Sequence, residues 1–203
     1  MLKIFRDART AKLVNALRTG DRQSLAGMAK RVGAEQLAAP LDRGMNAPEL
    51  ALQAGQPDAL AWVLKQAPLA DGQTAEGVPY TLVALRHAEQ SLGLLTALLQ
   101  AGADANARFE GRSLLSWCFD CCAQERLMLH LSRLVQHGAE LSREAALVSL
   151  ALERDDRATV HFLIHSGAPL PERIDELACS AELRDHARRC AEDKRIRDMM
   201  LGG

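Results

Sequence analysis

The sequence contains very few aromatic residues: four Phe, two Trp and one Tyr make up 3% of its 203 residues. Large β-sandwich and barrel cores depend on β-branched and aromatic side chains, so this composition argues against them. Leu, Ala and Arg are abundant instead, and all three favour helices. With 48% hydrophobic residues, the chain has the apolar content of one or two globular domains. We therefore expect an all-α protein.

The sequence also lacks any apolar run near the ~18 residues that a membrane-spanning helix needs. Its first residues, MLKIFRDARTAK, contain no apolar segment of the kind that directs secretion. Its five cysteines are an odd number and unevenly spaced, which is typical of reduced thiols rather than of a disulfide framework. We therefore predict a cytoplasmic protein without a membrane partner. Arg far outnumbers Lys, a bias typical of GC-rich bacterial genomes.

The charge balance and the motif content exclude further classes of protein. The 25 basic and 26 acidic residues give a net charge of −1, whereas nucleic-acid-binding proteins usually carry a basic surplus. The chain has no G-x-S-x-G elbow, no phosphate-binding loop and no dinucleotide fingerprint. We therefore predict that the protein is not an enzyme, uses no cofactor or small-molecule substrate, and does not bind nucleic acid.

One element recurs along the chain: leucines at helical spacing, followed by Gly-Ala or a near copy, as in LLTALLQAGADANA. The glycine position falls at residues 33, 67 (an alanine), 102, 138 and 167, at intervals of 34, 35, 36 and 29. Glycine after a helix supplies the left-handed conformation that ends it. Further short apolar helices are expected at residues 46–54, 79–88, 113–122 and 143–153. The pattern predicts a repeated unit of two antiparallel helices and a connector.

These units resemble the ankyrin repeat, whose consensus has G-x-T-P-L-H-x-A before the first helix and L-L-x-x-G-A-D-x-N after the second. The best copy, QAGADANARFEGRSLLSWC, follows this consensus at Gly102, Ala103, Asp104, Asn106, Gly111, Ser113 and Leu115. Two other copies match at Gly77, Pro79, Tyr80 and Leu82, and at Gly44, Leu50, Ala51 and Gly55. The resemblance covers roughly residues 10–170, although no copy contains the full Thr-Pro-Leu-His.

The resemblance implies an all-α ankyrin-repeat solenoid of stacked helix-turn-helix units with short hairpin-like connectors and a C-terminal helical cap. We expect one domain over residues 1–203, with repeats at about 10–43, 44–76, 77–110, 111–141 and 142–170 and the cap at 171–203. Stacked units share one core because a two-helix unit cannot bury its apolar stripe alone. The predicted core comprises Leu60, Val63, Leu64, Leu95, Leu98, Leu131, Leu134, Val160, Leu163 and Ile164. Trp62 and Trp117 also lie in apolar helical stripes, so we expect both in the core.

In such a fold the connector tips and first helices form a concave face that is free to bind a partner. The predicted partner-binding residues are Gln73, Glu76, Tyr80, Arg108, Phe109, Glu110, Arg112 and Asp120. Phe109 has two interpretations: it folds back onto the stack, or it stands out as an anchor. We therefore predict a non-catalytic module that binds another protein. A sharper hypothesis is a dedicated inhibitor, or immunity-type partner, of a bacterial toxin or effector.

The segment WCFDCC supports an alternative: a metal- or redox-responsive regulatory protein using the Cys118–Cys122 cluster. The competing interpretation is buried or incidental thiols, because no second ligand pair follows at a zinc-site spacing. HFLIH places His161 and His165 on one helix face, a geometry that can share a metal. The simpler interpretation is that both histidines face solvent, so we predict no metal site.

Overall fold

The computed structural model describes residues 2–201, with residues 2–7 placed only as backbone of a helix. About 62% of the chain is helical, and the only sheet in the described range is one two-stranded hairpin. The prediction of an all-α protein is confirmed. No helix among residues 2–201 combines the length and apolar character needed to cross a membrane.

The chain divides into two compact units at His137 and Gly138, which we call unit 1 and unit 2 and describe separately. Unit 1 contains α1 (Leu2–Thr19), α2 (Arg22–Met28), α3 (Ala34–Ala38), α4 (Ala47–Gln53), α5 (Pro57–Gln66), α6 (Tyr80–Leu85), α7 (Ser91–Gln100), β1 (Arg108–Phe109), β2 (Arg112–Ser113), α8 (Leu114–Cys121) and α9 (Gln124–Gln136). Unit 2 contains α10 (Ala145–Glu153), α11 (Arg157–His165), the 3-10 helix η1 (Ile174–Glu176) and α12 (Ala181–Leu201).

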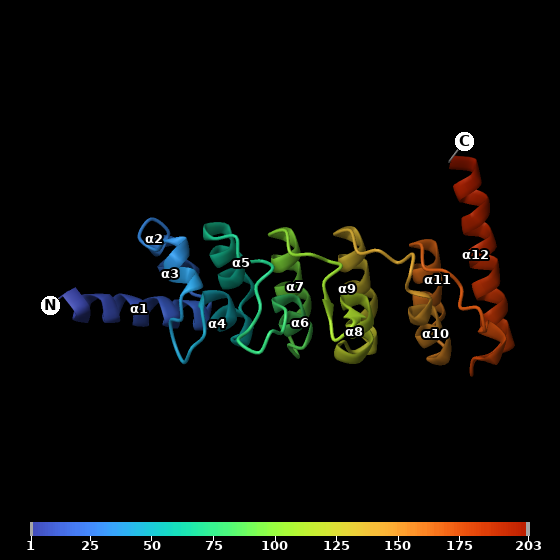
Figure 1. The fold of residues 1–203 in the computed structure, drawn as a ribbon, viewed down its shortest axis with the longest axis horizontal. Coiled ribbons are helices and arrows are strands. Elements are labelled where there is room, and N and C mark those ends of the chain that lie inside the picture. Colours follow the sequence, from blue (N-terminus) through green and yellow to red (C-terminus); the bar gives the residue numbers. More distant parts are fainter. Residues whose placement is uncertain (1, 202–203) are drawn as a thin grey trace. The chain divides into compact units, whose positions relative to one another are not determined.

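Short helices pair within unit 1, and neighbouring pairs pack side by side (Figure 1). α4 packs against α5, α6 against α7, and α8 against α9. The first helices α4, α6 and α8 contact one another in sequence, and so do the second helices α5, α7 and α9. The first helices predicted at residues 46–54, 79–88 and 113–122 agree with α4, α6 and α8 to within a few residues.

Hydrogen bonds join positions that lie one period apart in unit 1. The backbone N–H of Asp104 donates to Asp71 Oδ1 at 2.7 Å, across 33 residues. The amide Nδ2 of Asn46 donates to the Tyr80 hydroxyl at 2.7 Å, across 34 residues. The period found in the sequence therefore corresponds to contacts between neighbouring helix pairs.

Every residue of the predicted core is buried, from Leu60 in α5 to Ile164 in α11. The two tryptophans are only half-buried, so their assignment to the core is wrong. Both side chains are partly exposed, although the Nε1 atom of Trp62 is buried. Tryptophan is rarely enclosed completely because of its size.

The glycines of the repeated element do not all have the same role. Gly102 and Gly138 follow α7 and α9 with φ values of 95° and 90°, the left-handed conformation predicted for a helix end. Gly33 has φ −90° and precedes α3 instead. The element at residue 33 therefore opens a short helix that the sequence pattern did not predict.

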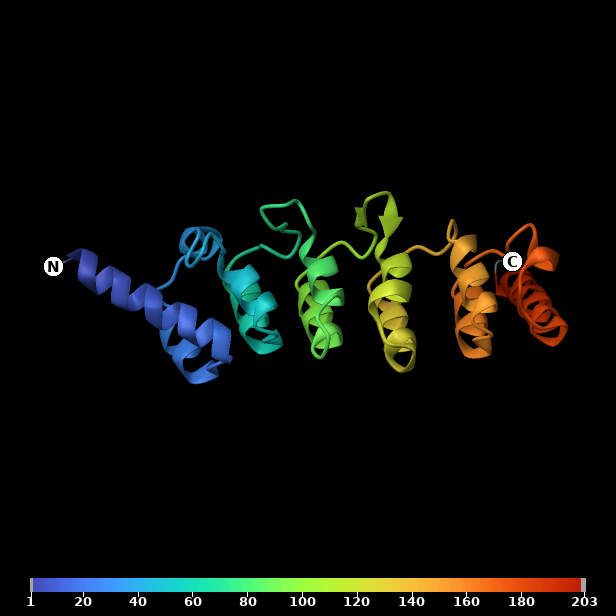
Figure 2. The ribbon, with the colours of Figure 1, turned by 90° about the horizontal axis from the view of Figure 1, so that it is seen from below.

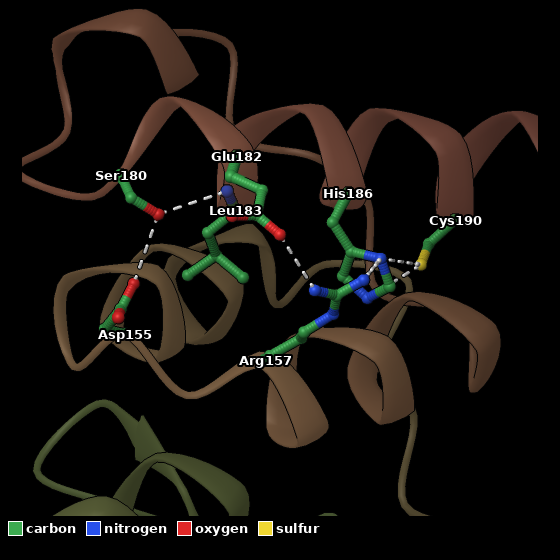
Figure 3. A network of polar contacts seen from close by, with 7 residues as sticks. All are labelled: Asp155, Arg157, Ser180, Glu182, Leu183, His186 and Cys190. Carbon is green, nitrogen blue, oxygen red and sulfur yellow. Dashed lines mark hydrogen bonds and ion pairs between the residues drawn. The ribbon is translucent and has the colours of Figure 1, made fainter.

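In unit 2, α10 pairs with α11, and the 21-residue helix α12 packs against α11. The buried residues of α12 are Leu183, Ala187 and Cys190, whose spacing places them on one face. The Ser180 hydroxyl accepts a hydrogen bond from the Leu183 N–H at 3.2 Å and lies 3.5 Å from Asp155 Oδ1 (Figure 3). These contacts join the start of α12 to the turn between α10 and α11.

Candidate functional site

A hairpin projects from unit 1 immediately before α8, on the same side as the connector that precedes α6 (Figure 2). Its strands β1 and β2 are antiparallel, with Phe109 opposite Arg112. The turn residues Glu110 and Gly111 have φ values of 52° and 75°, which is the pattern of a type I′ turn. Ser113 ends the hairpin and caps α8, because its side chain accepts a hydrogen bond from the Ser116 N–H at 3.2 Å.

Trp117 of α8 lies beneath this hairpin, in contact with two guanidinium groups. Arg112 Cζ lies 4.3 Å from the indole ring centroid, and Arg86 Cζ lies 5.1 Å from it. Both distances are within the range of cation–π attraction. The Phe109 ring is tilted by 46° at 6.2 Å from the indole, whose Nε1 donates to the Phe109 carbonyl at 3.3 Å. Phe109 therefore folds back and is half-buried, the first of the two interpretations.

Polar contacts hold Arg112 in place against the indole. Its Nη1 forms an ion pair with Asp120 Oδ2 at 2.6 Å. Its Nη2 donates to the Ser116 hydroxyl at 3.1 Å and to the Ser116 carbonyl at 3.3 Å. A guanidinium held by several acceptors loses little rotamer freedom when a partner arrives. We refer to Arg86, Phe109, Arg112, Trp117 and Asp120 as the Trp117 cluster.

The remaining predicted site residues have different environments. Gln73, Glu76, Arg108 and Glu110 are exposed at the connector tips. A hydrogen bond with Thr74 is the main cause of a lowered pKa at Glu76. Tyr80 does not belong to this surface: it is 2% exposed, and its hydroxyl accepts the bond from Asn46. Its ring occupies the core because Tyr80 is the first residue of α6, where the connector enters the helix pair.

Arg86 and Trp117 are the cluster members that were not predicted from the sequence. Arg86 follows the last residue of α6, and α6 contacts α8, which carries Trp117.

The Cys118–Cys122 segment forms a second polar group in unit 1. Cys118 is buried, whereas Cys121 and Cys122 are half-buried, and none of them forms a disulfide. His130 is buried, with Nδ1 2.8 Å from the Arg126 carbonyl and Nε2 3.0 Å from the Ser91 hydroxyl. A carbonyl oxygen only accepts, so Nδ1 of His130 carries a proton. Nε2 can therefore donate to the Cys122 thiolate only when the ring is an imidazolium.

This arrangement separates the pKa values of the two neighbouring thiols. Hydrogen bonds with Cys118 and then with His130 lower the pKa of Cys122 to about 6. The same bond with Cys122, together with burial, raises the pKa of Cys118 well above its ordinary value. Burial acts to lower the pKa of His130, but its bonds with Cys122 and the Arg126 carbonyl outweigh burial and raise it. A lowered pKa favours the thiolate form of Cys122, which is the reactive form of cysteine.

Comparison of the sequence with protein-family models gives no match, and comparison with curated proteins gives none either. The functional assignment therefore depends on the geometry of the chain itself.

Proposed function

We propose that the protein is a non-catalytic binding module of the ankyrin-repeat type, which binds another protein through the connector tips and the Trp117 cluster of unit 1. The observation that carries this proposal is the half-exposed indole of Trp117, which two guanidinium groups contact beneath a projecting hairpin. Trp and Arg are the residue types most enriched in binding hot spots, where truncation costs ~2 kcal/mol or more.

The repeat arrangement supports the ankyrin part of the proposal. Helix pairs recur in unit 1 at the sequence period, and hydrogen bonds join positions 33 and 34 residues apart. Between α7 and α8, the connector forms a β-hairpin at the place where the ankyrin consensus has one. In this interpretation, α10 and α11 form a further repeat, and α12, which packs against α11, is the C-terminal cap.

The fixed position of the Arg112 side chain in the Trp117 cluster favours binding. Arg112 already has its carboxylate, hydroxyl and carbonyl partners, so the surface needs little rearrangement to meet a partner. Two guanidinium groups against one indole suit a partner surface that combines an apolar side chain with a carboxylate. A dedicated inhibitor of a bacterial toxin or effector is the sharper form of this proposal.

Site-specific photo-crosslinking tests the proposal. A photoreactive amino acid replaces Glu110 at the hairpin tip or, as the control, Leu129, which is 53% exposed on α9. We expect a discrete crosslinked partner from position 110 only, and its loss when Trp117→Ala is added. Equal capture from both positions, or capture that survives Trp117→Ala, would count against this surface. For the inhibitor form, co-expression should restore growth to cells that produce the captured partner.

A metal- or redox-responsive regulator is the second candidate function. It is favoured by the half-buried, unoxidised Cys122 thiol, which interacts with buried His130 and whose pKa is lowered by that contact and by Cys118. In that case binding of the captured partner should change on oxidation and recover on reduction, whereas the first proposal alone expects no dependence on oxidant.

A further inference from the structure

Unit 2 contains a group of metal-ligating side chains between α11 and α12. It comprises His161 of α11 with His186 and Cys190 of α12, and one ligand atom from each lies within 4.8 Å of the others. Cys190 is only 3% exposed, His186 is half-buried and His161 is exposed. Figure 3 shows the His186 ring turned toward the Cys190 sulfur, one helical turn further along α12. Within the described residues, no other group of three His, Cys, Asp or Glu gathers as closely.

The distances fit one tetrahedral ion. The Cys190 sulfur lies 3.5 Å from His161 Nδ1 and 3.5 Å from His186 Nε2. Zinc–sulfur and zinc–nitrogen bonds of ~2.3 Å and ~2.05 Å at the tetrahedral angle place the two ligand atoms ~3.6 Å apart. Two of the three distances between ligand atoms, the two from sulfur to nitrogen, therefore already match a tetrahedral ion. The third distance separates the two imidazole nitrogens, and rotation of the exposed His161 side chain can shorten it.

We propose that His161, His186 and Cys190 bind one Zn²⁺ ion, which links α11 to α12, with water as the fourth ligand. A thiolate and two imidazoles form a ligand set that suits zinc and disfavours the oxygen-seeking ions Mg²⁺ and Ca²⁺. Three protein ligands leave one coordination position for solvent, on the side where His161 is exposed.

The neighbouring ring of His165 provides an independent observation. Its centroid lies 4.2 Å from that of His161. Its Nδ1 is buried and has no hydrogen-bond partner in the part of the chain that the structure describes. A buried nitrogen without a partner is costly, and water on the proposed ion is one donor that would satisfy it.

Arg157 acts as a competitor of the metal. Its Nη2 lies 3.4 Å from His186 Nδ1, and its Nη1 pairs with Glu182 at 3.4 Å (Figure 3). A guanidinium only donates, so in this contact His186 Nδ1 must be unprotonated and accept the hydrogen bond. The proton of the neutral ring is then on Nε2. Zinc at Nε2 requires the opposite tautomer, with the proton on Nδ1. Metal binding must therefore displace Arg157, whose side chain is 58% exposed and free to turn into solvent.

Titration of the full-length, untagged protein with Co²⁺ and then Zn²⁺ tests the site. We expect one Co²⁺ per chain, with the thiolate-to-cobalt charge-transfer band and the visible bands of tetrahedral coordination, and displacement of cobalt by Zn²⁺. Cys190→Ser should abolish the charge-transfer band. His161→Gln and His186→Gln should each weaken zinc binding by at least about 10-fold, measured against a chromophoric chelator. Arg157→Met should strengthen it.

Matched variants separate this site from the other thiols. Cys179→Ser removes a half-buried thiol of unit 2, and Cys122→Ser removes the acidic thiol of unit 1. Both should keep the band and the stoichiometry. His161 is exposed, so His161→Gln should keep the far-ultraviolet circular dichroism of the parent even if Cys190→Ser does not. Binding without a thiolate band, binding that survives Cys190→Ser, or unchanged affinity in His161→Gln would overturn the proposal.

Discussion

The pH dependence of Cys122 offers a quantitative test of the arrangement around His130. With a pKa of about 6 instead of the ordinary 9.0, Cys122 should react with a small disulfide probe along a curve whose midpoint lies near pH 6. The sign follows from the ionisation: protonation below pH 6 removes the thiolate and slows the reaction, whereas the rate is nearly constant above pH 7. An ordinary thiol is still gaining rate at pH 8.

The absolute rate is a weaker readout than the midpoint. At pH 7 a thiol of pKa 6 is about 90% thiolate, against about 1% for a pKa of 9. The intrinsic nucleophilicity of a thiolate falls as the pKa of its thiol falls. With a Brønsted slope of ~0.45, a pKa lower by three units makes the thiolate about 20-fold less nucleophilic. The net advantage at pH 7 is therefore only about fourfold. The midpoint, by contrast, moves by the full difference in pKa.

Peptide mapping by mass spectrometry after timed labelling gives the rate at Cys122 separately from Cys118 and Cys121. Cys118→Ala removes the largest cause of the lowered pKa and His130→Gln removes the next, so each should move the midpoint upward. Cys179→Ser is the control and should leave it unchanged. A midpoint of pH 8 or above in the parent protein, or no movement in either variant, would refute the proposed thiolate–imidazolium pair.

Three further predictions concern stability and are each measured by urea unfolding. Glu110→Asn should stabilise the protein by about 0.5–1 kcal/mol, because Asn tolerates the left-handed conformation better than Glu; a loss of stability would contradict the type I′ turn. Phe109→Ala should cost about 1 kcal/mol and change the fluorescence of Trp117, since the two rings are in contact; an unchanged spectrum would show that Phe109 points away. Tyr80→Phe should cost about 1 kcal/mol because Asn46 loses its acceptor, and no cost would mean that water replaces the hydroxyl.

The helices and the core were predictable because both depend on local spacing. Leucines at helical intervals have to lie on one face, and paired helices have to bury that face together. Leu95, Leu98, Leu131 and Leu134 are accordingly all buried. The same reasoning fails at the edge of a stripe, where Trp117 satisfies the spacing but lies half in solvent. Whether an edge residue is covered depends on the neighbouring pair, which the spacing within one helix does not describe.

The polar groups were less predictable because they combine residues from neighbouring helices. Ser91 and His130 are 39 residues apart, and His161 and Cys190 are 29 residues apart. The sequence contains the short motifs C-x-x-C and H-x-x-x-H, yet the group of metal ligands that the described residues form takes only one histidine from the second motif. Its other two ligands are on α12, a helix whose sequence does not follow the repeat.

This pattern has a physical basis in how the helix pairs pack. A repeat of about 30–40 residues brings the same helix faces of neighbouring pairs into contact, so polar residues separated by roughly one period are placed together. Polar side chains of neighbouring helices meet at Arg86 and Trp117 in unit 1 and at His161 and Cys190 in unit 2. Searching a repeat protein for functional groups at separations near its own period is a better guide than searching for contiguous motifs.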